Sequence, residues 1–356
     1  MKRFIFSAIA LMVAATACTE SGIIDMPDFY GNAIVFNTYI GKTPVTKAVS
    51  VDETYLQKSQ STGGGVHVTA FLKNQTTGTI NFDSAYLDAD MTYVKEDGSN
   101  PAYWSYGETA YWPDGEDLAF AAYSLNAESC VVQGTQNLTG FDFQINEDKS
   151  EQVDLLAVSF DASQVTDQSG DKQITLNFLH LLSRIGYKVY ATDSGVDITI
   201  QSIKLCGAFP SKGKVDLRSN PAAIQPYAEN GDAYTYSYEF FNENESFAIS
   251  SDECSPALAN AKQIYTNKKG ASTVGDTEDY YLMIMPGQID ETYIEVTYLL
   301  AEESKPYYAR VDLGNWNFRA GYAYEFVFKI ATASIEFSAE VVEGSWDEQT
   351  PEEKPL

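Results

Sequence analysis

Residues 324–341 read YEFVFKIATASIEFSAEV and contain two runs in which apolar side chains occupy every second position. The first run extends from Tyr324 to Ile330, and the second extends from Ile335 to Val341. Successive side chains of a β-strand point to opposite faces of its sheet, so an alternation of this length is typical of a strand with one face on a core. The segment therefore predicts two such strands.

The same period-two pattern recurs in three earlier runs, at residues 34–40, 66–71 and 234–240. Turn signals rich in Gly, Pro, Asn and Asp separate the strand-like runs, as at 97–101 and 113–115. The composition points the same way, because 24 Tyr and 19 Phe are residues that favour pleated, half-buried surfaces. Short strands with turns between them predict an all-β protein built as sandwiches or barrels.

The length of 356 residues suggests two domains rather than one. A small polar cluster at 192–195 separates two strand-rich halves, so we expect domains at 33–192 and 193–346, followed by an acidic tail at 347–356. Helical signals are weak. We expect one long, bent strand over 174–191 and a single helical turn over 257–262.

The N-terminus has the pattern of an export signal. Lys2 and Arg3 precede an apolar run, residues 4–17, which is short for a membrane span and typical of a signal-peptide core. Cys18 follows directly, and this arrangement resembles the lipobox of bacterial lipoproteins, in which the cysteine receives a lipid. We therefore expect a signal peptide at 1–17, lipidation of Cys18 and a tether at 18–32. The alternative is a plain secretory signal cleaved after Ala17.

The formal net charge of −27 excludes one class of partner. A surface of this sign repels nucleic acid and anionic lipid headgroups, so we expect no nucleic-acid binding.

Three further cysteines, Cys130, Cys206 and Cys254, are odd in number and widely spaced. This spacing matches neither a disulfide framework nor a zinc site. The alternatives are one disulfide or small buried side chains, and the second is the simpler interpretation.

No constellation of residues predicts catalysis, a cofactor or a metal. The two histidines, His67 and His180, lie in strand-like segments without a catalytic motif around them. Asp88 and Asp90 are weighed as calcium ligands, as is the acidic group at 114–117, but neither follows a twelve-residue calcium loop. We expect solvated acidic loops, no catalytic or cofactor-binding residues and no metal.

Two tryptophans are candidates for sugar stacking. Trp104 and Trp112 lie in aromatic clusters beside Pro and Gly. Such rings stack on sugars in some sites, and in β proteins they also close the ends of a core. Both interpretations stay open at this point.

Several short segments occur together in an order that resembles the fimbrillin family, subunits of type V pili in Gram-negative bacteria. Beside the leader they are residues 34–36, 46–48, 111–113, 118–123, 155–157, 178–184 and 281–287, and a terminal strand ending in Trp346. The resemblance implies two consecutive transthyretin-like (Greek-key) β-sandwich domains and no enzyme activity.

The resemblance also implies an assembly mechanism. A surface protease would cut at the Lys47–Ala48 bond and remove a first strand at 33–41, whose inner face carries Ile34, Phe36 and Ile40. A strand of another pilus subunit would then fill the groove by β-strand addition. The candidate C-terminal strand for this role carries four alternating apolar residues, Ile335, Phe337, Ala339 and Val341.

The expected location follows from the same resemblance. The precursor would be exported and held at the outer membrane through a lipid on Cys18, and the mature form would lie in a cell-surface fimbrium. A host or bacterial surface ligand is a further expected partner. Lys47 stands where the family also uses arginine, and the tail DEQTPEEKPL has two prolines that disfavour a strand. These departures favour a tip or other terminal subunit.

Two other functions are compatible with the sequence. The main alternative is a surface lipoprotein that binds glycans through aromatic platforms at Trp104 and Trp112. A secreted hydrolase is the third, and it requires a pocket that gathers carboxylates around one histidine.

Overall fold

The structure is a computed structural model of the whole chain. It describes residues 33–40, 56–58, 64–97, 101–146, 152–160, 164–168, 171–191, 197–227, 236–241, 247–249, 265–266, 282–300, 304–330, 338–345 and 352–354. Cys18, Lys47, Ala48, Ile335, Phe337, the tail beyond Ser345 except 352–354, and the expected helical turn at 257–262 lie outside these ranges.

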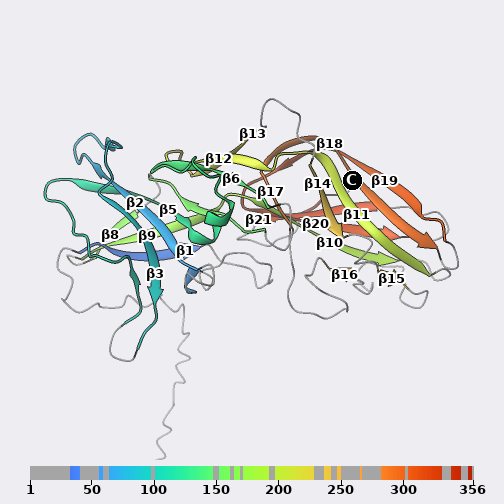
Figure 1. The fold of residues 1–356 in the computed structure, drawn as a ribbon, viewed down its shortest axis with the longest axis horizontal. Helices are drawn as coiled ribbons and strands as arrows, with labels where there is room; N and C mark the ends of the chain where they lie inside the picture. Colours follow the sequence, from blue (N-terminus) through green and yellow to red (C-terminus); the bar gives the residue numbers. More distant parts are fainter. Residues whose placement is uncertain are drawn as a thin grey trace, which may run out of the picture.

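The described part of the chain is almost entirely β-structure, arranged along an elongated molecule with the N-terminal strands at one end and the C-terminal strands at the other (Figure 1). The all-β fold predicted from the alternation is therefore confirmed. One 3-10 helix, η2, spans Leu125–Cys130.

The N-terminal half contributes nine strands to the described structure. They are β1 (Val35–Ile40), β2 (Val66–Lys73), β3 (Leu87–Val94), β4 (Tyr103–Ser105), β5 (Asp117–Ser124), β6 (Gly140–Gln144), β7 (Leu156–Val158), β8 (Gln164–Gln168) and β9 (Asp171–His180). All except β6 belong to one sheet, in the order β1-β9-β7-β5-β2-β3-β4 with β8 beside β9.

The remaining strands begin with β10. They are β10 (Ser183–Ala191), β11 (Ile198–Phe209), β12 (Lys212–Asp216), β13 (Ala223–Tyr227), β14 (Tyr236–Phe241), β15 (Phe247–Ile249), β16 (Tyr265–Thr266), β17 (Leu282–Ile284), β18 (Gly287–Leu300), β19 (Tyr307–Phe318), β20 (Tyr322–Ile330), β21 (Ser338–Ser345) and β22 (Glu352–Lys354). They form a six-stranded sheet around β10 and β20 and a five-stranded sheet around β11 and β18, and β12 pairs with both β13 and β6.

The C-terminal half is a two-layer sandwich. Its core contains Ile185 of β10 and Phe326 of β20 from one sheet, and Leu205 of β11 and Val296 of β18 from the other. Apolar faces of two sheets bury each other in this way in β-sandwiches. The alternating run that begins at Tyr324 therefore has the role that its pattern predicts, with Tyr324 and Phe326 on the buried face.

The N-terminal sheet has apolar cores on both of its faces. One core contains Phe36 of β1 together with Val68 and Phe120 of the central strands. The opposite face carries Phe71 and Tyr123, which pack in a second core with Val215 of β12 and Met283 of β17. The second core is therefore built by both halves of the chain.

A three-stranded sheet, in the order β13-β12-β6, crosses between the two halves (Figure 1). β12 pairs with β6 from Lys212↔Gln144 to Asp216↔Gly140. A buried hydrogen bond adds to this junction, because the backbone N–H of Met283 donates to Gln152 Oε1 at 2.8 Å.

The expected single strand over 174–191 is divided in the structure. β9 ends at His180 and β10 begins at Ser183, and the two belong to different sheets. β10 pairs in parallel with β20, so its hydrogen bonds place it with the C-terminal half. The change of sheet at Leu181–Leu182 therefore precedes the polar cluster at 192–195 that marked the expected boundary.

Part of the expected acidic tail at 347–356 is a β-strand. Residues 352–354 form β22, which pairs with β21 between Pro351 and Pro355. β22 itself contains no proline, in keeping with the exclusion of proline from strand ladders.

Candidate functional site

β1 lies at one end of the N-terminal sheet order and is the most distinctive feature of this half. It pairs in parallel with β9 over six residue pairs, from Val35↔Gln173 to Ile40↔Phe178. Its start is fixed on the other side, where the Ile34 N–H donates to the Ala110 carbonyl at 2.9 Å and Ala33 bridges Tyr111. Figure 1 shows β1 beside β9 at the N-terminal end of the molecule.

The inner face of β1 is inserted into an apolar core. Ile34, Phe36 and Ile40, the three residues expected on this face, are all buried. Between them Thr38 is buried too, whereas the side chain of Tyr39 on the outer face is 50% exposed. The strand therefore fills a groove in the remainder of the sheet, and three of its side chains, together with that of Ile34 just before it, occupy that groove.

Phe36 is the central contact of β1. Its ring meets Tyr106 edge-on at a centroid distance of 5.4 Å and Phe120 at 5.5 Å. Edge-to-face aromatic pairs add stabilisation beyond the apolar area they bury. The Tyr106 hydroxyl also donates to the Ile34 carbonyl at 2.7 Å, and burial raises the pKa of this phenol, so it stays a donor.

A cavity of about 200 Å³ adjoins the start of β1. Ile34 and Val35 line one side of it, and residues 103–107 with Thr109 line the other. The cavity lies where β1 and β4, the two ends of the sheet order, approach each other.

Trp104 and Trp112 belong to the same core. Only 7% of Trp104 and 5% of Trp112 are exposed, and the Trp112 ring packs on Phe120 at 5.9 Å. A ring that stacks on a sugar has to present one face to solvent. The burial of these two indoles therefore argues against the glycan-binding alternative and favours a role in closing the core.

His67 lies on the face of β2 that also carries Phe71, and side chains of β3 hold it. Its Nδ1 is 2.8 Å from Asp90 Oδ1, and its Nε2 is 3.1 Å from Asp88 Oδ1. The imidazole also packs on the Tyr123 ring at 4.9 Å. The two aspartates weighed as calcium ligands thus bind a histidine of the neighbouring strand, and burial with the charge of Asp90 raises the pKa of nearby Glu128.

His180 is part of a buried pair at the junction of the two halves. Its Nδ1 lies 2.7 Å from Asp154 Oδ2, and the exposed fractions of the two side chains are 1% and 0%. A substrate cannot reach a pair so deeply buried, so this geometry gives no support to a hydrolase. Within the described residues, no group of three or more His, Cys, Asp or Glu side chains is placed to hold a metal ion.

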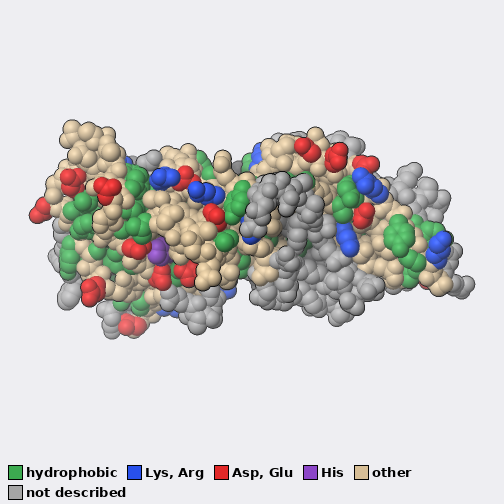
Figure 2. Space-filling view, turned by 45° about the horizontal axis from the view of Figure 1, so that its top comes forward, with side chains coloured by type: hydrophobic (Ala, Val, Ile, Leu, Met, Phe, Trp, Pro, Cys, Tyr) green, Lys and Arg blue, Asp and Glu red, His purple; other side chains and the backbone are tan. Residues whose placement is uncertain are grey.

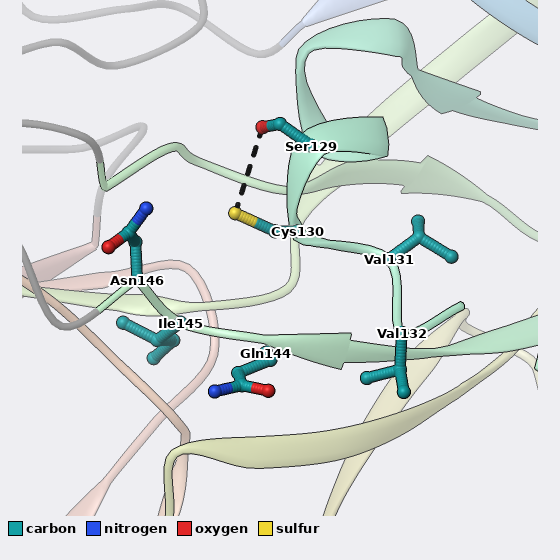
Figure 3. A pocket seen from close by; sticks show the side chains of 7 residues that line it. All are labelled: Ser129, Cys130, Val131, Val132, Gln144, Ile145 and Asn146. Atoms are coloured by element: carbon teal, nitrogen blue, oxygen red, sulfur yellow. Dashed lines mark hydrogen bonds between the residues drawn. The ribbon is translucent and has the colours of Figure 1, made fainter.

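A second cavity, of about 360 Å³, lies between η2 and the end of β6 (Figure 3). Residues 129–132 and 144–146 line it, and none of these seven carries a charge. The Cys130 thiol lies 3.8 Å from the Ser129 hydroxyl, and burial raises its pKa. The thiol is therefore protonated near neutral pH and is a weak nucleophile.

Cys130 and Cys206 are both free thiols, and Cys254 lies outside the described residues. Cys206 is buried on β11 and donates to Glu295 Oε2 at 3.9 Å. Burial and the charge of Glu295 raise its pKa from 9.0 to about 11.

Alkylation measures this effect directly. Since the thiolate is the reactive form, a pKa of about 11 in place of 9.0 leaves roughly a hundredfold less thiolate at pH 8. We expect iodoacetamide to label Cys206 far more slowly in the folded chain than in urea, as followed by mass spectrometry of its peptide. Equal labelling rates in both conditions would contradict the burial of this thiol.

The candidate C-terminal strand is only partly described. Ala339 and Val341 lie in β21, where they pair with Phe328 and Phe326 of β20, and Ile335 and Phe337 fall outside the described residues. The processing residues Lys47 and Ala48 and the lipidation residue Cys18 also fall outside them.

Acidic side chains are not concentrated in one place on the face shown in Figure 2. Figure 2 shows Asp and Glu side chains spread over both ends of the face in view rather than gathered at one place. Among the described residues, no helix is long and apolar enough to cross a membrane.

These features define a β-sandwich protein whose distinctive site is a strand-filled groove rather than a ligand pocket. The chain belongs to the fimbrillin-like family, whose model matches residues 58–344.

Three solved structures are similar to this chain. A fimbrial protein from Bacteroides vulgatus has a TM-score of 0.60 and 15% sequence identity, and the match covers 88% of this chain and 99% of that one. A candidate cell adhesion protein from Bacteroides uniformis has a TM-score of 0.46, 13% identity and coverages of 88% and 98%. The tip fimbrial protein Mfa3 from Porphyromonas gingivalis has a TM-score of 0.39 and 7% sequence identity, and the match covers 85% of this chain and 98% of that one.

The first of these similarities shows a common fold. A search of curated proteins finds no match.

Proposed function

We propose that the chain is a structural, non-enzymatic subunit of a fimbria, and that it assembles when β1 is removed by proteolysis and a strand of another subunit takes its place. Membership of the fimbrillin-like family supports the fimbrial role. The observation that carries the mechanism is β1 itself, an end strand with its inner face buried in the core.

The position of Lys47 in the sequence suits this mechanism. It follows Ile40 by seven residues and precedes the next described segment, which begins at Leu56. A cut between Lys47 and Ala48 therefore separates β1 from the rest of the core. The same cut would separate the core from Cys18 and from the lipid proposed there, so the outer-membrane anchor would hold only the uncut precursor.

The groove left by β1 would attract another strand strongly. Burial of Ile34, Phe36 and Ile40 stabilises the sheet by roughly 1.5–3 kcal/mol for each side chain, and this is lost when β1 leaves. The edge of β9 would also lose its backbone hydrogen-bond partners. Because β1 is parallel to β9, a strand that replaces it in the same register has to run parallel to β9 as well.

The C-terminal strand supports a terminal position in the fimbria. β21 pairs with β20 over eight residue pairs and with β22 over three more. Donation of this strand to another subunit would break those hydrogen bonds. We therefore propose a subunit that accepts a strand and sits at the tip or at another end, where a host or bacterial surface ligand is a further proposed partner.

A protease of matched specificity tests the mechanism. In the Lys47→Arg chain, an arginine-specific protease is expected to cut after residue 47, and the wild-type chain is expected to stay uncut between β1 and Leu56. The cut chain should then bind a labelled peptide with the sequence of residues 33–41, measured by fluorescence anisotropy, and the uncut chain should not. A cut chain that binds no such peptide would contradict refilling of the groove.

A further inference from the structure

Thr38 is a polar residue in an otherwise apolar groove. It is 8% exposed, and its Oγ1 has no hydrogen-bond partner among the residues that the structure describes. A buried hydroxyl without a partner destabilises the structure that contains it, because its hydrogen bonds to water are lost and not replaced. β1 therefore fills its groove, but at Thr38 it places a polar hydroxyl among apolar side chains.

The side chains next to Thr38, both along β1 and across the sheet on β9, are apolar. Along β1 its neighbours on the same face are Phe36 and Ile40, and across the sheet it pairs with Leu176. Leu176 is fully buried, and Ile174 and Phe178, which flank it on the same face of β9, are buried too.

We propose that Thr38 makes β1 a replaceable occupant of the groove, and that the strand which replaces it carries an apolar residue at this position. The inference rests on the proposed refilling of the groove and adds a rule for the incoming strand. Valine has nearly the same shape as threonine but carries a methyl group in place of the hydroxyl, so it would fill the same space without burying a polar atom. β-branched apolar residues also suit an extended backbone.

The sequence of this chain contains a segment that follows the rule. Residues 335–341 place Ile335, Phe337, Ala339 and Val341 at the same spacing as Ile34, Phe36, Thr38 and Ile40. The two series agree in an aliphatic residue, then Phe, then a small residue, then a β-branched one. Ala339 stands at the position of Thr38, so a strand of this composition would leave no hydroxyl in the groove.

Peptide competition tests the rule. The full chain carrying Lys47→Arg is cut after residue 47 with β1 left in place, and a labelled peptide of residues 33–41 is equilibrated with it. Unlabelled peptides then compete for the groove. We expect the Thr38→Val peptide to compete about tenfold better than the wild-type peptide, since an unpartnered buried hydroxyl is removed.

Two matched peptides control for composition. Asn37→Val makes a similar polar-to-apolar change at an exposed position of the same strand, and we expect it to compete within about twofold of wild type. Thr38→Ser keeps the hydroxyl and loses the methyl group, so we expect it to compete no better than wild type.

The outcomes separate the two proposals. If the wild-type peptide exchanges and Thr38→Val competes no better, Thr38 does not weaken β1 and the inference is overturned, while refilling of the groove stands. If no peptide of any sequence enters the groove, the proposed function itself fails.

Discussion

Replacing Phe36 by alanine is expected to lower the free energy of unfolding by about 3–5 kcal/mol, which is the usual effect of deleting a buried phenylalanine ring. The side chain is 2% exposed and contacts both Tyr106 and Phe120 edge-on. Its removal leaves a cavity in the centre of the groove. Urea denaturation followed by tryptophan fluorescence measures the change, because Trp104 and Trp112 lie in the same core.

Tyr39→Ala provides the control on the same strand. Tyr39 points away from the core and is half exposed, so its truncation should change the free energy of unfolding by about 0.5 kcal/mol or less. Similar losses for the two variants would mean that β1 does not depend on its inner face. In that case the groove would offer a replacing strand little affinity, and the proposed assembly would lose its energetic basis.

The strands were predictable from the sequence because their pattern is local. Alternation alone places β1 and β20 and assigns Phe36 and Tyr324 to inner faces. In a strand with one face exposed to solvent, apolar and polar side chains alternate every second residue. The same pattern does not encode which strands pair. The parallel pairing of β1 with β9 joins residues more than 130 positions apart, and nothing near Val35 indicates Gln173 as its partner.

The break at Leu181–Leu182 was hidden for a related reason. Both leucines are buried in the core shared by the two halves, so the apolar pattern continues through the point where the chain changes sheets. Periodicity shows that a residue is buried and does not show against which sheet. The crossing of β12 to β6 is likewise a tertiary pairing without a local signal.

The candidate site was predictable in part. The inner face of residues 34–40 follows from the alternation. The same period places Thr38 on this face, although a polar side chain is not itself a sign of burial, unlike those of Ile34, Phe36 and Ile40. The role of Trp104 and Trp112 could not be decided from sequence, because a sugar platform and a core plug both require large aromatic rings near turns. Burial separates the two interpretations.

Replacing Asp154 by alanine is expected to destabilise the chain by roughly 1–3 kcal/mol, because it removes one hydrogen-bond partner of a buried polar group. Asp154 Oδ2 lies 2.7 Å from His180 Nδ1, and both side chains are almost completely buried. His180 ends β9, just before the chain crosses to the C-terminal sandwich. The destabilisation should therefore appear as a lower urea midpoint of unfolding for both halves of the chain.

Asp312→Ala is the matched control, since Asp312 Oδ1 lies at the same 2.7 Å from Arg310 Nε but both side chains are more than half exposed. Solvent screens such a pair, so we expect no measurable change in the unfolding midpoint. Asp154→Asn, which keeps the shape and one acceptor oxygen, should fall between the two. If Asp154→Ala unfolds at the same urea concentration as Asp312→Ala, the buried pair does not stabilise the junction, and the apolar core, the β6–β12 ladder and hydrogen bonds such as that of Met283 to Gln152 join the halves without its help.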